Sequence, residues 1–221
     1  MGDLPPERVN IPSRPIENTG VDYAGPFYYK EGLRRATKYI KCYMAMFVCL
    51  ATKAVHIEIS ADLSTETFLN VLKRFISRRG RPANMYSDNA TNFVGAENEL
   101  TELREMFNNE NSVRKIINSL SAENIQWHFI PSRAPHHGGL WEAAVKSAKR
   151  HLHKVLENAS VRYDELVTFT VQVEAVLNSR PLTVISADAN DPSPLTPGHF
   201  LIGDSMTSYP EPSLETLPIN R

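Results

Sequence analysis

This sequence has almost no cysteine and no long apolar run. Its 221 residues include two cysteines, Cys42 and Cys49, whose odd spacing within an expected strand puts them on opposite faces and argues against a disulfide between them. We therefore expect two reduced thiols inside an intracellular protein. The longest apolar run covers residues 42–51, well short of the roughly 20 residues that span a bilayer. The first residues also lack the charged and apolar regions of a secretory signal, so neither a membrane span nor a signal peptide is expected.

A strong charge of either sign is also lacking, since the formal net charge is −1. That balance hides an uneven distribution, because residues 181–221 hold five acids and one base, whereas residues 1–180 hold 20 acids and 23 bases. The body is therefore mildly basic. The acidic tail contains seven of the 15 prolines, so we expect it to be extended against the body. With 42% hydrophobic residues the chain can bury a core, which excludes a disordered or fibrous protein.

Alternating and helical patterns of apolar residues predict an α/β protein. Strands are expected at residues 21–27, 39–50, 56–59, 84–87 and 125–130, and helices at 64–79, from 93 onward, at 113–120, 140–156 and 163–177. The helix at 64–79 has the clearest signals, because Ser64 can cap its start and the run Gly80-Arg81-Pro82 can end it. This order of elements predicts a mixed sheet with helices packed on it.

Three carboxylates stand in or near the ends of expected elements. Asp22 lies in a strand, Asp88 at the end of another strand, and Glu142 in the first turn of a helix. Because neighbouring parallel strands present their ends together, such acids can converge over one sheet edge, and hard oxygen ligands suit Mg²⁺ or Mn²⁺. The alternative is structural: a strand-end acid, a turn with a helix cap, and a favourable charge at a helix N-terminus. Spacing alone favours this alternative.

The helix that carries Glu142 adds basic residues beside it. Lys146 and Lys149 follow at i+4 and i+7 and so share its face, while Arg150 and Lys154 extend the basic side. An acid that binds metal with lysines beside it would suit a phosphate backbone, and the alternative is a solvated face with one ion pair. The apolar stripe expected to face the core from the same helix consists of Val145, Ala148, Leu152 and Leu156.

A second basic cluster lies near the end of the expected helix at 64–79. It either contacts phosphate or forms a solvated helix end, and the sequence favours neither. Its members are Lys73, Arg74, Arg78, Arg79 and Arg81.

Five ordered motifs resemble one protein family. The chain contains, in order, GVDYAGPF, SDNATNFVGA, APHHGGLWEAAVKSAKRHL, AVLNSRPLT and PLTPGHFLIG. From about Val21 to Gly203 it resembles the integrase catalytic core of LTR retrotransposons, within the retroviral integrase superfamily, and most closely the BEL/Pao type. The resemblance implies a ribonuclease H-like fold, an α/β architecture with a mixed five-stranded sheet flanked by helices. It also implies a DDE active site, which falls on Asp22, Asp88 and Glu142.

The same resemblance implies DNA integration by two-metal polynucleotidyl transfer. The three acids would hold two Mg²⁺ or Mn²⁺ ions, with Asp22 bridging both, and no small-molecule cofactor is expected. Such an enzyme is a transferase and endonuclease that trims the 3′ ends of element DNA and joins them to target DNA. The match places two glycines in a mobile loop before the catalytic helix. The residues expected to contact DNA are Asn92, Gly138, Gly139, Lys146, Lys149 and Arg150.

Domain organisation and partners complete these expectations. We expect an extended lead-in at residues 1–19, a catalytic core at 20–182 and a Pro-rich acidic extension at 183–221. Residues 108–123 resemble an insertion relative to retroviral integrases, and the two cysteines lack the spacing of the family's zinc-binding module. Expected partners are DNA and further copies of the chain in a homo-oligomer, in the nucleus and without a membrane. The alternatives are a host-retained, non-catalytic core that binds DNA or protein, and a plain nuclease of the same fold.

Overall fold

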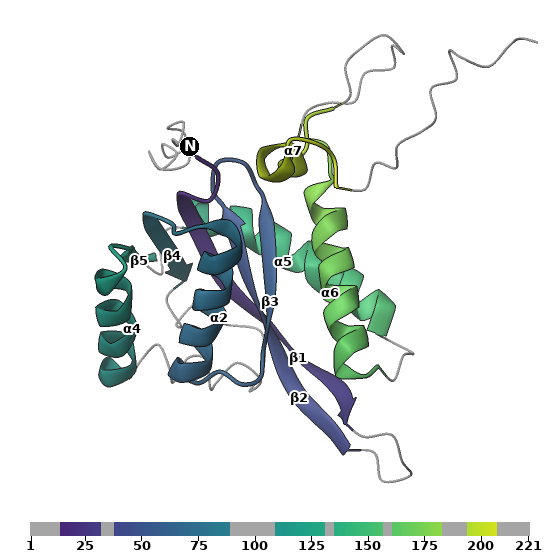
Figure 1. The fold of residues 1–221 in the computed structure, drawn as a ribbon, viewed down its shortest axis with the longest axis horizontal. Helices are drawn as coiled ribbons and strands as arrows, with labels where there is room; N and C mark the ends of the chain where they lie inside the picture. The colour runs from purple at the N-terminus through teal and green to yellow at the C-terminus, as the bar shows by residue number, and fades with distance from the viewer. Residues whose placement is uncertain are drawn as a thin grey trace, which may run out of the picture.

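A computed structural model describes residues 14–31, 38–88, 109–130, 135–156, 161–182 and 194–206. Within these ranges the chain forms five strands and five helices around one sheet (Figure 1). None of the helices in the described ranges combines the length and the apolar character that crossing a membrane requires.

The sheet is mixed and has five strands in the order β3-β2-β1-β4-β5. The long hairpin of β1 and β2 is antiparallel, β3 continues it antiparallel on one edge, and β4 and β5 run parallel to β1 on the other side. This arrangement confirms the mixed five-stranded sheet that the sequence predicts. The strands are β1 (Asn18–Glu31), β2 (Lys38–Cys49), β3 (Val55–Ser60), β4 (Asn84–Asp88) and β5 (Gln126–Ile130).

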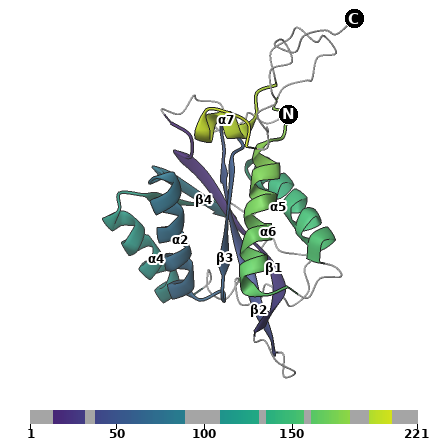
Figure 2. The same cartoon turned by 45° about the vertical axis from the view of Figure 1, so that its right-hand side comes forward.

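Helices cover both faces of the sheet. Figure 2 shows the sheet nearly edge-on, with α2 (Thr65–Arg79) and α4 (Glu110–Ala122) on one side. The other side carries α5 (Pro135–Leu156) and α6 (Tyr163–Asn178), which pack against each other and against β1. The short helix α7 (Pro197–Ile202) lies at the end of α6. The result is a three-layer sandwich with the sheet in the middle.

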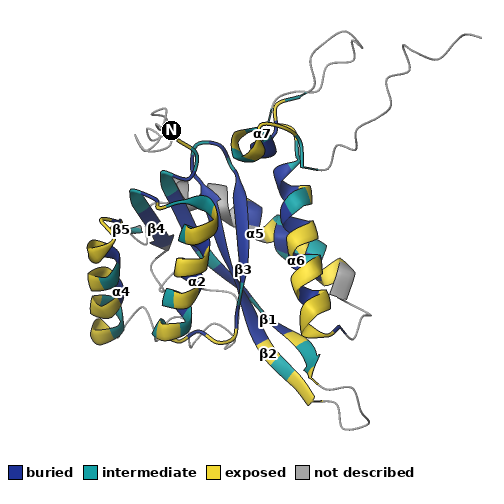
Figure 3. Cartoon of the chain, viewed as in Figure 1, coloured by how far each residue is buried: buried dark blue, intermediate teal, exposed yellow. Residues whose placement is uncertain are grey.

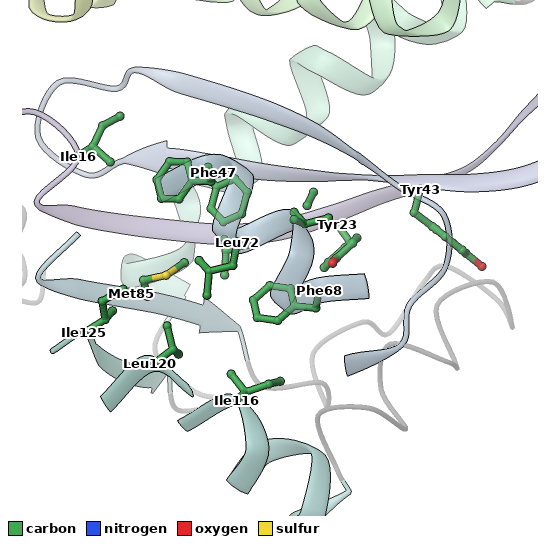
Figure 4. Close-up of a cluster of buried hydrophobic side chains, with 14 of the residues drawn as sticks. Ile16, Tyr23, Tyr43, Phe47, Phe68, Leu72, Met85, Ile116, Leu120 and Ile125 are labelled. Atoms are coloured by element: carbon green, nitrogen blue, oxygen red, sulfur yellow. The ribbon is translucent and has the colours of Figure 1, made fainter. Parts of the chain in front are cut away.

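Two hydrophobic clusters fill the spaces between these layers, and buried positions run through the sheet on both sides (Figure 3). The cluster under α2 and α4 includes Phe47, Phe68 and Met85 (Figure 4). Cys49 belongs to this cluster, whereas Cys42 belongs to the cluster under α5 and α6. The two thiols are free and lie on opposite faces, as predicted, and burial raises the pKa of Cys42 to about 11, so it stays protonated.

Local signals locate α2 accurately. The hydroxyl of Ser64 accepts a hydrogen bond from the Thr67 amide at 3.2 Å, and the Gly80 amide donates to the Ile76 carbonyl at 2.8 Å. Gly80 has φ +87°, a value that side-chain-bearing residues rarely adopt, so the helix ends where glycine stands. The helix expected from residue 93 lies outside the described residues.

Two helices differ from the sequence expectation. α5 begins at Pro135 instead of residue 140, because proline is well suited to the first helical position. α7 forms inside the tail that was expected to be extended, with Thr196 before it and Pro197 at its first position. Gly198 suits this close packing, since a Cβ atom would lie 3.0 Å from the Asp204 carbonyl and 3.2 Å from the Asn178 carbonyl, closer than ordinary van der Waals contact.

Candidate active site and the polar cluster at the sheet edge

Asp22 lies inside the central strand of the sheet. It is the fifth residue of β1, it pairs with Met46 of β2, and it is half-buried. Its Oδ1 accepts a hydrogen bond from the Tyr23 amide at 2.7 Å, which orients the carboxylate. The interpretation of Asp22 as a strand-end acid is therefore wrong. Acids are disfavoured in strand interiors and seldom buried there, so this position calls for another explanation.

Asp88 is the last residue of β4, the neighbour of β1. The parallel register pairs Val21 with Ser87, and one further step along both strands reaches Asp22 and Asp88. Neighbouring strands lie about 4.8 Å apart, so the two backbone positions are adjacent. Position 88 is in the same alternate set as Tyr86, which packs on the α5 side. The side chain of Asp88 lies outside the described residues.

Glu142 lies in the body of α5. The helix begins at Pro135, which makes Glu142 its eighth residue and not, as expected, part of its first turn. The influence of a helix dipole falls off within the first turn, so a favourable charge at the helix N-terminus no longer accounts for this acid. Ala144 and Ala148 of α5 are buried against the sheet in the cluster that includes Ala24. The side chain of Glu142 lies outside the described residues.

The backbone therefore places Asp22 and position 88 in the set that faces α5, and α5, the helix that carries Glu142, covers that face of the sheet. Asp22 and Ala24 alternate with Val21 and Tyr23, and the latter two pack in the cluster on the α2 side. Among the described side chains, no group of three or more His, Cys, Asp and Glu is arranged to hold a metal ion. The described side chains include that of Asp22 but not those of its two predicted partners, Asp88 and Glu142.

The predicted DNA-contacting residues fall into three groups. Lys146 and Arg150 are exposed on α5 and Lys149 is half-buried. Gly138 and Gly139 lie within α5, so the expectation of a loop before the catalytic helix is wrong for this structure, because the helix already starts at Pro135. Asn92 lies outside the described residues.

A cluster of buried charged side chains at the β3 edge was not predicted. His56 of β3 lies between two carboxylates, with Nε2 3.0 Å from Glu58 Oε1 and Nδ1 3.2 Å from Glu174 Oε2. All three residues are buried. Glu58 also accepts from Arg74 Nε at 2.7 Å and from Arg78 at 2.8 Å, and Glu174 forms an ion pair with Arg79. We call these six residues the edge cluster.

The edge cluster settles the role of the second basic group in the sequence. Arg74, Arg78 and Arg79 of α2 bind the carboxylates of β3 and α6. They therefore form neither a simple solvated helix end nor an open phosphate-binding site. Lys73 and Arg81, the other two members, are exposed. The cluster therefore ties α2, β3 and α6 together across the sheet edge.

The same region closes the open edge of β3. The outward-facing amide of Ile57 donates to Glu174 Oε2 at 2.8 Å, and the Val55 amide donates to Asn178 Oδ1 at 2.8 Å. Asn178 Nδ2 donates back to the Val55 carbonyl at 2.8 Å. Side chains one turn apart on α6 thus take the place of a sixth strand, which protects the edge from pairing with another chain. Asn178 comes from the motif AVLNSRPLT, so part of that motif has a structural role.

Hydrogen bonds set the protonation of the cluster. Burial alone would lower the pKa of His56, and Arg79 also lowers it, but hydrogen bonds to Glu174 and Glu58 outweigh both and raise the pKa above its ordinary value. Burial alone would raise the pKa values of Glu58 and Glu174, but their hydrogen bonds and nearby positive charges lower both. The positive charge of His56 therefore stabilises the ionised forms of Glu58 and Glu174, and their negative charges stabilise the protonated form of His56.

Comparison with known proteins shows the fold. No model of a known protein family matches the chain, and no curated protein matches it. Among solved structures, a chain of the simian T-cell lymphotropic virus intasome in complex with PP2A regulatory subunit B56 gamma is 16% identical, with a TM-score of 0.56 over 100% of this chain. This chain covers 64% of the length of that one.

Two isolated integrase domains are also similar. The HTLV-2 integrase catalytic core domain in complex with magnesium, in its trimeric form, has a TM-score of 0.50 at 17% identity and covers 86% of this chain and 98% of its own. The catalytic core domain of BIV integrase has a TM-score of 0.52 at 12% identity and covers 85% and 95%. The predicted ribonuclease H-like fold is therefore confirmed.

Proposed function

We propose that this chain is a DDE polynucleotidyl transferase of the retroviral integrase superfamily, of the BEL/Pao retrotransposon type. Its activity would be the trimming of the 3′ ends of element DNA and their joining to target DNA. The observation that carries this proposal is the β1 to β4 register, in which Asp22 and Asp88 follow the paired residues Val21 and Ser87 by one step. Glu142 belongs to the helix packed on the same face of the sheet.

The donor set fits divalent metal ions. Asp22, Asp88 and Glu142 offer only carboxylate oxygens, the hard ligands that Mg²⁺ and Mn²⁺ prefer, and the half-buried Asp22 already has one oxygen oriented by the Tyr23 amide. The three acids would hold two ions, with Asp22 shared between them. When bound, such a pair activates the attacking oxygen and stabilises the leaving 3′-oxygen of a phosphodiester. The HTLV-2 domain of similar fold is in complex with magnesium.

The other residues of the chain would position DNA. Lys146 and Arg150 are exposed on the helix that carries Glu142, and Lys149 is half-buried beside them. Their charges would bind phosphates and fix the position of the strand without reading its sequence. Asn92, Gly138 and Gly139 complete the proposed DNA contacts. The attacking group is water in end trimming and the freed 3′-hydroxyl in joining, so no side chain has to act as nucleophile.

Assembly and location belong to the same proposal. The similar HTLV-2 domain is described in a trimeric form, and the similar simian viral chain comes from an intasome. We propose that this chain also works as a homo-oligomer on element ends and target DNA. Its place of action would be the nucleus, where target DNA lies.

The deciding experiment is a cleavage and strand-transfer assay on short duplexes with Mg²⁺ or Mn²⁺. The variants Glu142→Gln and Asp88→Asn should each abolish turnover and leave the fold intact, because each removes one carboxylate from the proposed donor set. The matched control is Glu66→Gln, since Glu66 is 83% exposed on α2. Near-parental turnover of either site variant would remove that residue from the site. An inactive parent that still binds DNA would favour the non-catalytic alternative.

A second measurement tests the site without turnover. Mg²⁺ should raise the melting temperature of the parent in a concentration-dependent way, because it binds the folded site and not the unfolded chain. At a free concentration ten times its dissociation constant the gain is about 1.4 kcal/mol. Asp88→Asn should melt no lower than the metal-free parent, since it removes a repelling charge, and should gain much less from Mg²⁺. A destabilised variant with the full Mg²⁺ gain would make Asp88 a structural cap instead.

A further inference from the structure

The face of β4 and β5 that turns toward α5 is polar, although the sheet lies between two layers of helices. On the α2 side these strands present Met85 and Trp127, which pack in or against the hydrophobic cluster there. On the α5 side they present Asn84, Tyr86 and His128. Parallel strands that are buried on both faces are usually apolar throughout, whereas these two strands alternate. The polar residues on the α5 side therefore call for a role other than core packing.

This polar face leads to the proposed metal site. The register pairs Tyr86 with His128, and Asp88 follows Tyr86 by two residues and so lies on the same face. With neighbouring strands about 4.8 Å apart and a rise of about 3.3 Å per residue, the Cα atoms of Asp88 and His128 are about 8 Å apart. A DNA strand held at the proposed site would therefore pass close to His128.

Neighbouring side chains hold the His128 ring in place. The ring stacks on that of Tyr86, with centroids 4.9 Å apart and an interplanar angle of 16°. His128 Nε2 lies 2.9 Å from Asn84 Oδ1, and Asn84 Nδ2 donates to Asn18 Oδ1 at 2.9 Å. Because the Asn84 nitrogen is the donor toward Asn18, its Oδ1 is the acceptor and His128 Nε2 carries the hydrogen. The uncharged ring then has an acceptor at Nδ1.

This second ring nitrogen is not used by the network. His128 is half-buried, and within the part of the chain that the structure describes its Nδ1 has no hydrogen-bond partner. An acceptor needs a donor, and the phosphates and sugars inside a DNA strand offer none. The bases do, because adenine and cytosine present amino groups in the major groove. We propose that His128 Nδ1 accepts a hydrogen bond from such an amino group near the processed end of the DNA. This inference rests on the proposed function and adds base selectivity to it.

The contact would supply what the other proposed DNA contacts lack. Lys146, Lys149 and Arg150 would bind phosphates, which carry no sequence information. A single acceptor held rigidly on the sheet distinguishes adenine and cytosine from guanine and thymine, because the latter two present only acceptors in the major groove. One hydrogen bond of this kind gives a preference of about 2- to 10-fold.

Two substitutions at one position separate the two ring nitrogens. An asparagine side chain can place its oxygen where Nδ1 lies, and a glutamine side chain places its polar atoms where Nε2 lies, since the numbers of bonds from Cα match. His128→Asn should therefore keep the base preference. His128→Gln should lose it and keep the hydrogen bond to Asn84. The control is Asn118→Ala, which changes an exposed residue of α4 on the other side of the sheet.

The test selects bound duplexes from a library that is randomised over its terminal base pairs, and then sequences them. All variants are made in the Glu142→Gln background, so that the readout is binding without turnover. The Glu142→Gln protein, His128→Asn and Asn118→Ala should enrich adenine or cytosine about 2- to 10-fold at one position. His128→Gln should show no enrichment there and should bind the unselected library with unchanged affinity and salt dependence.

Three results would overturn the inference. The first is equal enrichment in His128→Gln. The second is loss of the preference in both His128 variants, which would mean that the ring acts only through its stacking on Tyr86. The third is a lower salt slope in His128→Gln, which would mean that a charged ring binds phosphate. Circular dichroism checks that each variant is folded.

The outcomes also separate this inference from the proposed function. A parent that is active in strand transfer, but whose base preference does not depend on His128, refutes the inference alone. A parent without turnover that still selects adenine or cytosine through His128 supports the inference and refutes the proposed catalytic function.

Discussion

Two groups of acids lie on this sheet, and they differ in what surrounds them. Glu58 and Glu174 at the β3 edge each bind His56 and at least one arginine of α2, and Glu174 also accepts a backbone amide. Asp22 lies two strands away, half-buried in the centre of the sheet, and the neighbouring strand brings Asp88 beside it. The arginines of α2 that bind the edge acids give those acids a structural role, whereas Asp22 and its predicted partners on the α5 side are the candidate for metal chemistry.

The strands that carry Asp22 and the edge cluster also differ in their backbone pairing. β1 is an inner strand that pairs with β2 on one side and β4 on the other, so Asp22 does not lie at an open edge of the sheet. β3 is an edge strand whose outer amides would be open to another chain, and Asn178 and Glu174 of α6 accept from two of them, those of Val55 and Ile57. The edge acids are therefore part of the scaffold. A substitution at the edge should change stability, and a substitution in the centre should change activity.

Glu174→Ala should have the largest effect on stability. It removes the acceptor of the Ile57 amide and the carboxylate that pairs with Arg79 and His56, all in a buried setting. Breaking a buried pair from one side typically costs about 3–5 kcal/mol. Urea denaturation monitored by circular dichroism measures this cost as a shift of the transition midpoint.

The control for this prediction is again Glu66→Gln, which removes an acid whose 3.8 Å pair with Lys115 is exposed. Exposed pairs contribute about 0–1 kcal/mol, so the control should unfold close to the parent. Similar unfolding free energies for Glu174→Ala and the control would mean that the edge cluster does not stabilise the scaffold. The contrast with the central acids would then be lost.

The sequence predicts one of these groups and misses the other for a physical reason. Asp22, Asp88 and Glu142 stand in motifs that can be read locally. The register of β1 and β4, which the structure shows, makes the backbones of Asp22 and Asp88 neighbours. The edge cluster depends on contacts between residues far apart in the chain, such as His56 with Glu174, separated by 118 positions. In the sequence its arginines look like any basic helix end. The only local hint is the alternation of His56 and Glu58 in an otherwise apolar strand.

The ends of helices can likewise be predicted from the sequence only where contacts within a few residues determine them. Ser64 and Gly80 fix α2 through contacts within a few residues, so the sequence locates both ends. The start of α5 depends on whether a helix continues through Gly138 and Gly139, and local propensity argues against that. α7 packs with Gly198 close to the Asn178 carbonyl of α6, a residue 20 positions earlier in the chain. Propensity contains no information about such a contact.

The second largest expected effect is on the pH dependence of the free energy of unfolding, to which the three ionisable residues of the edge cluster should contribute. The pKa of His56 is raised from 6.5, so its contribution is fully present below pH 6.5 and is lost as pH rises through the folded value. The pKa values of Glu58 and Glu174 are lowered from 4.5, so their contributions are present above pH 4.5 and are lost as pH falls. The cluster therefore stabilises most between these limits.

His56→Gln should flatten the alkaline side of the curve. One proton changes the free energy of unfolding by up to about 1.4 kcal/mol per pH unit, and the variant has no such proton to lose. The matched control, His153→Gln, removes an exposed histidine of α5 and should keep the parental slope. Urea denaturation at several pH values provides the comparison. An unchanged alkaline slope in His56→Gln would show that His56 does not titrate with folding.

The smallest expected effect is on the salt dependence of DNA binding, in variants of the basic faces of α5 and α2. Arg78 of α2 is 59% exposed, yet it is bound 2.8 Å from Glu58, whereas Lys146 of α5 is exposed on the helix that carries Glu142. If phosphates bind only the second face, Lys146→Ala with Lys149→Ala should weaken binding to all duplex sequences alike and reduce the log–log salt slope by about 0.9 per lost contact. Arg78→Ala should leave that slope unchanged and lower the midpoint of urea denaturation, because Glu58 loses one of its cations. Anisotropy titrations at several salt concentrations measure both variants. A slope reduced equally by Arg78→Ala would place DNA on the α2 face as well, and the division between a scaffold edge and a DNA-binding face would not hold.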